Sequence, residues 1–194
     1  LIGIMRMARQ HAISTRQWTL VVFPNQDGGI YPGTDGESVD KCLRSVAVLG
    51  VVNTMDGLPR VDQIPPNMDF EFVVDWKTFP NGIYLDDDVT LNGNFLFSEA
   101  STVFDYPMDP ATPQVRVRPM SVVMFRPNGR AYVMHGGNAN GKYWQDTDHS
   151  KIYLVADKHY EASGGQLSPP TAIPGPRTVV EVRNKTGQVT ILDP

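Results

Sequence analysis

Three consecutive acidic residues, Asp86, Asp87 and Asp88, are the first candidates for chemistry in this chain of 194 residues. Carboxylate oxygens are the ligands that Ca²⁺ prefers. These three lie in a strand-like run, however, where successive side chains point to opposite faces and cannot converge on one ion. The D-x-D-x-D-G spacing of a calcium loop is also absent. We therefore expect a solvated sheet edge, where charge discourages edge-to-edge pairing, and no metal site.

A second candidate ligand set combines two histidines and two aspartates. Asp146, Asp148 and His149 lie together in a polar stretch, and His135 closes the apolar run before it. Imidazole and carboxylate groups are zinc ligands, but this spacing matches no zinc signature. We expect no metal here either.

Nucleophilic and phosphate-binding motifs are equally weak. The single cysteine, Cys42, excludes an intramolecular disulfide and a cysteine-based zinc cluster. It precedes an apolar strand, which is typical of a small buried hydrophobe. There is no G-x-S-x-G motif, and the glycine-rich residues 136–141 precede no helix that would bind a phosphate. His11 and His159 have no evident partner group. We expect no catalysis and no cofactor.

Aromatic residues in expected loops favour an alternative function. Tyr31, Tyr143, Trp144 and Tyr160 lie in polar stretches, where exposed rings bind sugar or protein. The alternative is therefore a surface adhesin or glycan-binding β-domain, with calcium at its acidic loops. Packing of these rings against a sheet is the more ordinary expectation.

The composition indicates one ordinary globular domain, residues 1–194, with 41% hydrophobic and 20% charged residues. A net charge of −4 makes nucleic acid an unlikely partner, although Arg116, Arg118, Arg126 and Arg130 could form a local basic patch. No run reaches the roughly 18 apolar residues that span a bilayer, and no signal peptide is visible.

The first seventeen residues predict a helix on which the later strands are expected to pack. An apolar face recurs at helical spacing, and the arginines Arg6, Arg9 and Arg16 lie off it. We expect an amphipathic helix of about four turns over residues 1–17. It starts on its apolar face without an N-cap residue, which fits either the remainder of a longer apolar segment or a natural start with a frayed first turn. Its interaction face comprises Leu1, Ile4, Met5, Ala8, Ala12 and Thr15.

The rest of the chain, residues 18–194, predicts strands joined by turns rich in Gly and Pro. Residues 43–53 indicate a strand buried on both faces, with a bulge at Gly50. Residues 69–76 alternate, placing Phe70, Phe72, Val74 and Trp76 on one face. Asn128-Gly129 predicts a hairpin turn. Further strands are expected within 18–24, 82–91, 94–104, 115–127, 130–137, 151–157, 177–184 and 187–193, and loops within 24–41, 136–150 and 158–176. The predicted fold is α+β: one amphipathic helix packed on antiparallel sheets of roughly eight to ten strands.

Four segments follow one another along the chain. They are MARQHA at 7–12 with WTLVV at 18–22, WKTFPNGI at 76–83, FRPNGRA at 125–131 and VRNKTGQV at 182–189. In this order they resemble the type IV pilin superfamily, and within it the minor pseudopilins of the GspH/FimT type. The first looks like the family's passage from helix to strand, and the second is similar to its W-x-x-L-P-x-G segment, with Phe in place of Leu. The third matches F-x-P-x-G-x-A, and the fourth looks like the closing T-G hairpin.

The resemblance implies a function in assembly and no catalysis. The chain would be a minor pilin or pseudopilin of a type II secretion pseudopilus or a type IV pilus. The family's apolar half-helix is not in this sequence, so the resemblance implies a segment before Leu1 that anchors the chain in the inner membrane. Its partners would be other pilin or pseudopilin subunits. Its location would be the bacterial cell envelope, with the domain in the periplasm or in an extracellular pilus.

Overall fold

The computed structural model of the chain describes residues 1–24, 43–52, 70–86, 105–107, 117–135, 143–145, 149–156, 161–163, 166–168 and 176–192. Within these residues one helix, α1 (Ile2–Thr15), precedes all of the strands. The predicted α+β class is confirmed, because every strand pairing is antiparallel. Thirteen strands are described, more than the eight to ten expected.

The first sheet is built around β1, which pairs with β2 on one side and β6 on the other. Its strand order is β3-β2-β1-β6-β7-β8, and β5 pairs with the start of β6. The strands are β1 (Thr19–Pro24), β2 (Ser45–Val51), β3 (Phe70–Thr78), β5 (Asp105–Pro107), β6 (Val117–Phe125), β7 (Ala131–His135) and β8 (Tyr143–Gln145).

A second sheet lies beside the first, in the order β13-β12-β9-β4. Its strands are β4 (Ile83–Leu85), β9 (His149–Ala156), β12 (Arg177–Arg183) and β13 (Gln188–Leu192). β10 (Glu161–Ser163) and β11 (Gln166–Ser168) form a separate two-stranded sheet. The expected strand at 94–104 lies outside the described residues.

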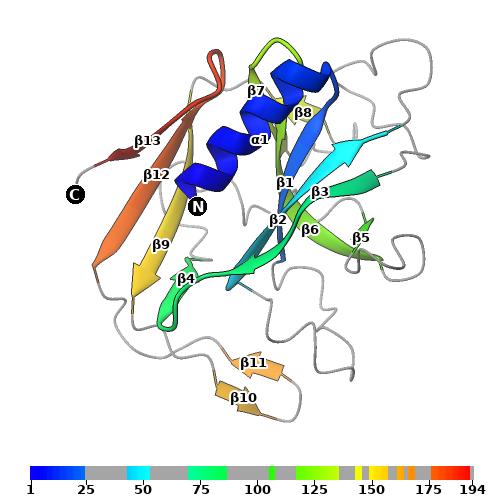
Figure 1. Cartoon of the computed structure of the whole chain (residues 1–194). Helices are drawn as coiled ribbons and strands as arrows, with labels where there is room; N and C mark the ends of the chain where they lie inside the picture. The colour runs from blue at the N-terminus through cyan, green and yellow to red at the C-terminus, as the bar shows by residue number, and fades with distance from the viewer. Residues whose placement is uncertain are drawn as a thin grey trace.

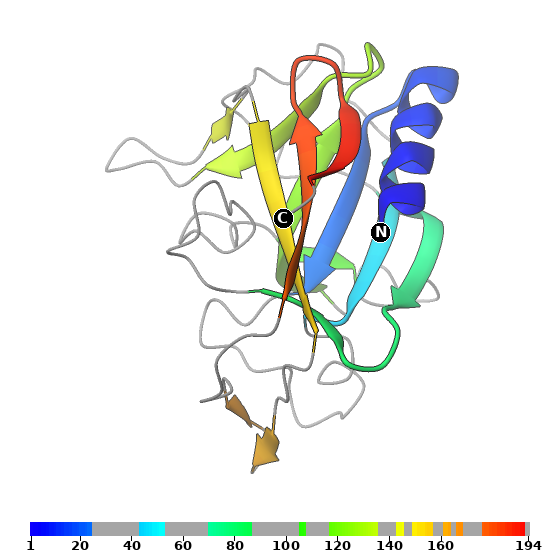
Figure 2. The ribbon, with the colours of Figure 1, turned by 90° about the vertical axis from the view of Figure 1, so that its left-hand side faces the viewer.

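The helix lies over the first sheet with the second sheet at its side, as Figures 1 and 2 show. It contacts β1, β2 and β6 of the first sheet and β13 of the second. Met5, Ala8 and Ala12 are fully buried at this contact. Ala8 and Ala12 have only a methyl group as side chain, so the helix axis can come close to the strands.

The helix ends earlier than the predicted residue 17. Arg16 adopts a left-handed conformation with φ of 57°, which terminates the helix and turns the chain into β1. Thr15 was expected on the buried face, but it is exposed. Its hydroxyl instead donates to the carbonyl of His11, at 2.8 Å.

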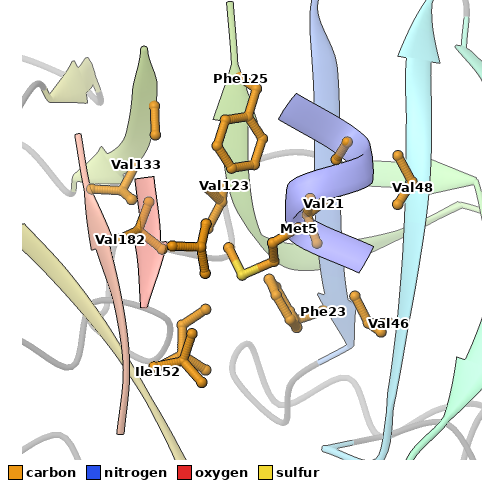
Figure 3. Close-up of a cluster of buried hydrophobic side chains, with 14 of the residues drawn as sticks. Met5, Val21, Phe23, Val46, Val48, Val123, Phe125, Val133, Ile152 and Val182 are labelled. Atoms are coloured by element: carbon orange, nitrogen blue, oxygen red, sulfur yellow. The ribbon is translucent and has the colours of Figure 1, made fainter. Parts of the chain in front are cut away.

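The space between the helix and the two sheets is filled by what we call the helix-side core. Figure 3 shows Met5 among valine and phenylalanine side chains of β1 and β6, with Ile152 of β9 and Val182 of β12 closing the other side. Its buried members are Met5, Ala8, Ala12, Val21, Phe23, Leu43, Val46, Val48, Phe79, Leu85, Val123, Phe125, Ala131, Val133, Ile152, Val180, Val182 and Val189.

The opposite face of the first sheet carries a second apolar cluster, the opposite-side core. Since side chains alternate along a strand, Val21 and Phe23 face the helix while Leu20 and Val22 face away. The expectation of a strand buried on both faces is confirmed for Ser45–Val51, since every residue of β2 is buried, but Val52, within the predicted range of 43–53, is 44% exposed. The buried members of this core are Trp18, Leu20, Val22, Ala47, Leu49, Val51, Met120, Val122, Met124 and Tyr132.

Strand β3 departs from the predicted alternation. Its register against β2 shifts between Val46 and Val48 and between Val48 and Leu49, so the irregularity lies before the Gly50 position that we predicted. An extra residue in a strand reverses which face the next side chain occupies. Val74 consequently packs on the helix-side core, whereas Phe72 and Trp76 pack on the opposite-side core.

Candidate interaction site at the helix and two glycine turns

Apart from Thr15, the residues of the predicted interaction face all lie toward the body of the same chain. Met5, Ala8 and Ala12 have no exposed surface, and Leu1 and Ile4 are half-buried against the helix-side core. The exposed residues of α1 lie on its other side and are Gly3, Arg6, Met7, Gln10, Ser14 and Thr15.

Two arginines on the flank of α1 hold the ends of two hairpins. Arg9 Nε donates to the carbonyl oxygens of Gly129 at 3.2 Å and Thr186 at 3.1 Å. One turn earlier, Arg6 Nη2 donates to the carbonyl oxygen of Val189 at 3.2 Å. The sequence placed both arginines off the apolar face, but nothing in their spacing indicated these partners.

The two turns held by Arg9 are themselves in contact. Gly129 and Gly187 have φ values of 78° and 64°, which L-residues rarely adopt. A Cβ added to Gly187 would overlap the carbonyl oxygen of Gly129. Glycine at 187 is thus required by both its backbone conformation and the close approach of the other turn.

A further backbone hydrogen bond joins the same two hairpins. Ala131 N donates to the carbonyl oxygen of Asn184 at 2.8 Å. Asn184 is fully buried, and its side chain exchanges hydrogen bonds with Ser150 at 3.1–3.2 Å. The first sheet, the second sheet and the helix therefore meet at one junction, which we call the helix–turn junction: Arg9, Gly129, Ala131, Asn184, Thr186 and Gly187.

Three of the four segments that carry the family resemblance meet at this junction. They supply the helix arginine, the Asn-Gly turn and the Thr-Gly turn. The fourth, residues 76–83, forms the connection from β3 to β4, where Ile83 N donates to the carbonyl oxygen of Pro80 at 3.0 Å. Its Phe79 is buried in the helix-side core. Residues distant in sequence thus form a common structural unit.

On the other face of the first sheet, Arg126 has a different environment. Its Cζ lies 4.2 Å from the ring centroid of Tyr132 and 5.1 Å from that of Trp18. Nε and Nη2 are buried, and within the described part of the chain neither has a hydrogen-bond partner. Of the four arginines of the expected basic patch, Arg126 and Arg130 lie at the two ends of the same turn. Arg116 and the side chain of Arg118 lie outside the description.

The acidic run does not form the expected solvated edge at its first residue. Asp86 is 1% exposed, and Arg177 Nε lies 2.6 Å from its Oδ2. This prediction was wrong for Asp86 because Arg177 pairs with it across the second sheet. Asp87 and Asp88 lie outside the described residues.

The other candidate residues are only partly described. His135 ends β7 and His149 begins β9, while Asp146 and Asp148 lie outside the described residues. Among the residues that the structure describes, no three His, Cys, Asp or Glu side chains form a metal-binding group. Other candidates outside the description are Cys42, residues 136–141, Tyr31, His159 and Tyr160.

Two predictions about single side chains need correction. His11 was given no partner, but its Nδ1 lies 3.0 Å from the hydroxyl of Thr19, a hydrogen bond that ties α1 to β1. Tyr143 and Trp144 were placed in a loop, but they belong to β8, paired with His135 and Met134 of β7.

Among the described residues, one ionisable group has a shifted pKa. Burial of the Leu1 amino group lowers its pKa below the usual value, since the charged form loses hydration.

The described residues include no helix long and apolar enough to cross a membrane.

Comparison with known proteins gives no relative: no family model, no curated protein and no solved structure matches this chain.

Proposed function

We propose that this chain is a structural subunit of an envelope filament, a minor pilin or pseudopilin of a type II secretion pseudopilus or a type IV pilus. Its role is assembly, without catalysis. Its partners are other pilin or pseudopilin subunits, and an apolar segment upstream of Leu1 anchors it in the inner membrane. Nucleic acid is not a partner in this proposal.

The observation that carries the proposal is the helix–turn junction. Arg9 of α1, the turn of Gly129 and the turn of Gly187 come from three of the segments that resemble the family. Because these segments contact one another directly, the same interaction between the helix and the two turns would account for all three sequence patterns. A filament subunit that is anchored through its N-terminal helix needs that helix to be firmly attached to its β-sheets. Here Arg9 attaches the helix through hydrogen bonds, and Met5 attaches it through apolar packing.

The exposed strip of α1 is the surface through which helices of neighbouring subunits would touch. Gly3, Met7, Gln10 and Ser14 follow at intervals of four, three and four residues, so they lie along one side of the helix. None of these four carries a charge, and Arg6, which lies beside Gly3 and Gln10, borders the strip.

The first experiment is to read the coding sequence upstream of Leu1. We expect a prepilin-type leader and an apolar stretch that continues the helix. If the upstream codons encode neither, the proposal fails.

A second experiment tests the assembly itself. The chain is expressed with its upstream segment and with Gln10→Cys, and disulfide cross-linking is followed in intact cells. We expect cross-linked species that contain other filament subunits. The matched control carries Gln10→Cys but lacks the upstream segment, and it should give none. Equal cross-linking in both versions would contradict filament assembly, because contact would then not depend on the anchoring half-helix.

A further inference from the structure

Arg126 lies at the start of the turn between β6 and β7, on the face of the first sheet opposite the helix. Phe125 packs in the helix-side core, so by strand alternation Met124 and Arg126 face the other way. Trp18 and Tyr132, which belong to the opposite-side core, lie against the Arg126 guanidinium. The cation is therefore fixed at the margin of an apolar cluster.

The two unsatisfied donors of Arg126 belong to one edge of the guanidinium. Nε–H and one N–H of Nη2 point in parallel, and this pair can donate to the two oxygens of a single carboxylate. Both nitrogens are buried, and within the described part of the chain neither has an acceptor. Leaving a charged donor buried without a partner is costly, and native structures rarely do so.

The neighbouring aromatic rings do not relieve this deficit. A ring attracts the cation through its π-face, but it offers no oxygen in the plane of the guanidinium. Arg44 is a useful comparison, because its Cζ lies 5.5 Å from the ring centroid of Tyr84. Its Nε is also buried and has no partner among the described residues, but its Nη2 donates to Asn81 Oδ1 at 3.4 Å. In Arg126 both donors of the edge lack a partner in the described part of the chain.

We propose that the Nε–Nη2 edge of Arg126 is a binding site for a carboxylate group, held by two parallel hydrogen bonds. Trp18 and Tyr132 lie against the guanidinium and orient it. Because both nitrogens are buried, a carboxylate reaches this edge only when the groups that cover it move aside. The carboxylate comes either from a free small molecule or from an acidic side chain of another protein, and both present the same chemistry to this edge. The inference does not depend on the proposed filament function.

The test is a titration of the purified chain followed by two signals. One is the Nε–H resonance of Arg126 in ¹⁵N-edited NMR, assigned by its loss in Arg126→Lys. The other is the fluorescence change that Trp18→Phe removes. The probes are sodium acetate and a tetraglutamate peptide, each compared with sodium chloride at matched ionic strength.

We expect both signals to saturate with a carboxylate probe and not with chloride. Arg126→Lys should weaken the apparent affinity at least tenfold, because an ammonium group cannot present a parallel pair of donors. Arg126→Met should abolish the response. Arg130→Met removes an exposed arginine of the same turn and should leave the affinity within twofold. Saturation by acetate at concentrations similar to those of the peptide indicates a small-molecule ligand, and much tighter binding of the peptide indicates a protein ligand.

Two outcomes would overturn the inference. One is the absence of any saturable response beyond that of chloride in the wild-type chain. The other is an Arg126→Met chain that titrates like wild type. If Arg126→Met does not fold, Arg126→Lys and the wild-type Nε–H resonance still decide the question.

Discussion

Arginine side chains reach the turn between β6 and β7 from both faces of the first sheet. On the helix face, Arg9 donates to two backbone carbonyl oxygens and joins α1 to two hairpins. On the other face, Arg126 lies against two aromatic rings while Nε and Nη2 lack acceptors among the described residues. Arg9 thus joins elements of the fold through its hydrogen bonds. Arg126 instead has two buried donors without acceptors among the described residues.

Arg9 and Arg126 therefore represent two different roles of an arginine side chain, which the amino-acid composition alone does not distinguish. A guanidinium whose donors are satisfied within the chain contributes to stability, and removing it should lower the free energy of unfolding. A guanidinium with buried, unsatisfied donors costs stability, and a protein retains it only if something else is gained. Three predictions test this comparison.

The largest effect should come from the apolar attachment of the helix. Met5→Ala empties a fully buried position in the helix-side core and should lower the free energy of unfolding by about 2–5 kcal/mol. Urea unfolding followed by circular dichroism measures it. The control is Met7→Ala on the same helix, where the side chain is 44% exposed and the change should stay within about 0.5 kcal/mol. Similar losses at both positions would mean that α1 does not contribute its inner face to the core.

The two glycines of the helix–turn junction should differ. Gly187→Ala combines a left-handed backbone with overlap on the Gly129 carbonyl oxygen, and we expect a loss of about 2–4 kcal/mol. Gly129→Ala meets only the ends of the Arg9 and Ile13 side chains, both at 3.1 Å, which can move aside. Its cost should be about 1–2 kcal/mol, mostly from the backbone. Unfolding midpoints of the two variants measure the difference, and a larger loss at Gly129 would contradict the contact between the turns.

The same substitution at the two arginines should change stability in different ways. Arg9→Met removes hydrogen bonds from a charged donor and should cost about 1–2 kcal/mol, with faster hydrogen exchange in α1. Arg126→Met removes an unsatisfied buried cation and keeps an apolar contact with the rings, so stability should be unchanged or higher by up to about 1 kcal/mol. Both are compared in buffer without carboxylates. Equal destabilisation by the two variants would remove the distinction between the faces.

The sequence predicted those features that repeat along one element. The buried face of α1 follows from the spacing of Met5, Ala8 and Ala12, and the burial of β2 from its continuous apolar run. The end of the helix at Arg16 and the displaced Val74 were missed, because a left-handed residue and a bulge leave no periodic signal. Strands β5, β8, β10 and β11 have only three residues each, too few to show alternation.

The sites were harder to predict than the elements. Arg9 and Thr186 are 177 positions apart in the chain, and the pairing of Asp86 with Arg177 spans 91 positions. Local spacing carries no information about such partners. The unsatisfied edge of Arg126 likewise depends on what surrounds the side chain, and not on its neighbours in sequence.

The position of β13 has a consequence for the order of folding. During synthesis α1 leaves the ribosome long before Val189, whose carbonyl oxygen receives the hydrogen bond from Arg6 183 positions earlier. Until that final hairpin is made, the helix has neither β13 nor the Thr-Gly turn to pack against. Because α1 precedes every described strand, its contacts with β13 and the Thr-Gly turn can form only after those residues have been synthesised, whereas its contact with β1 can form much earlier.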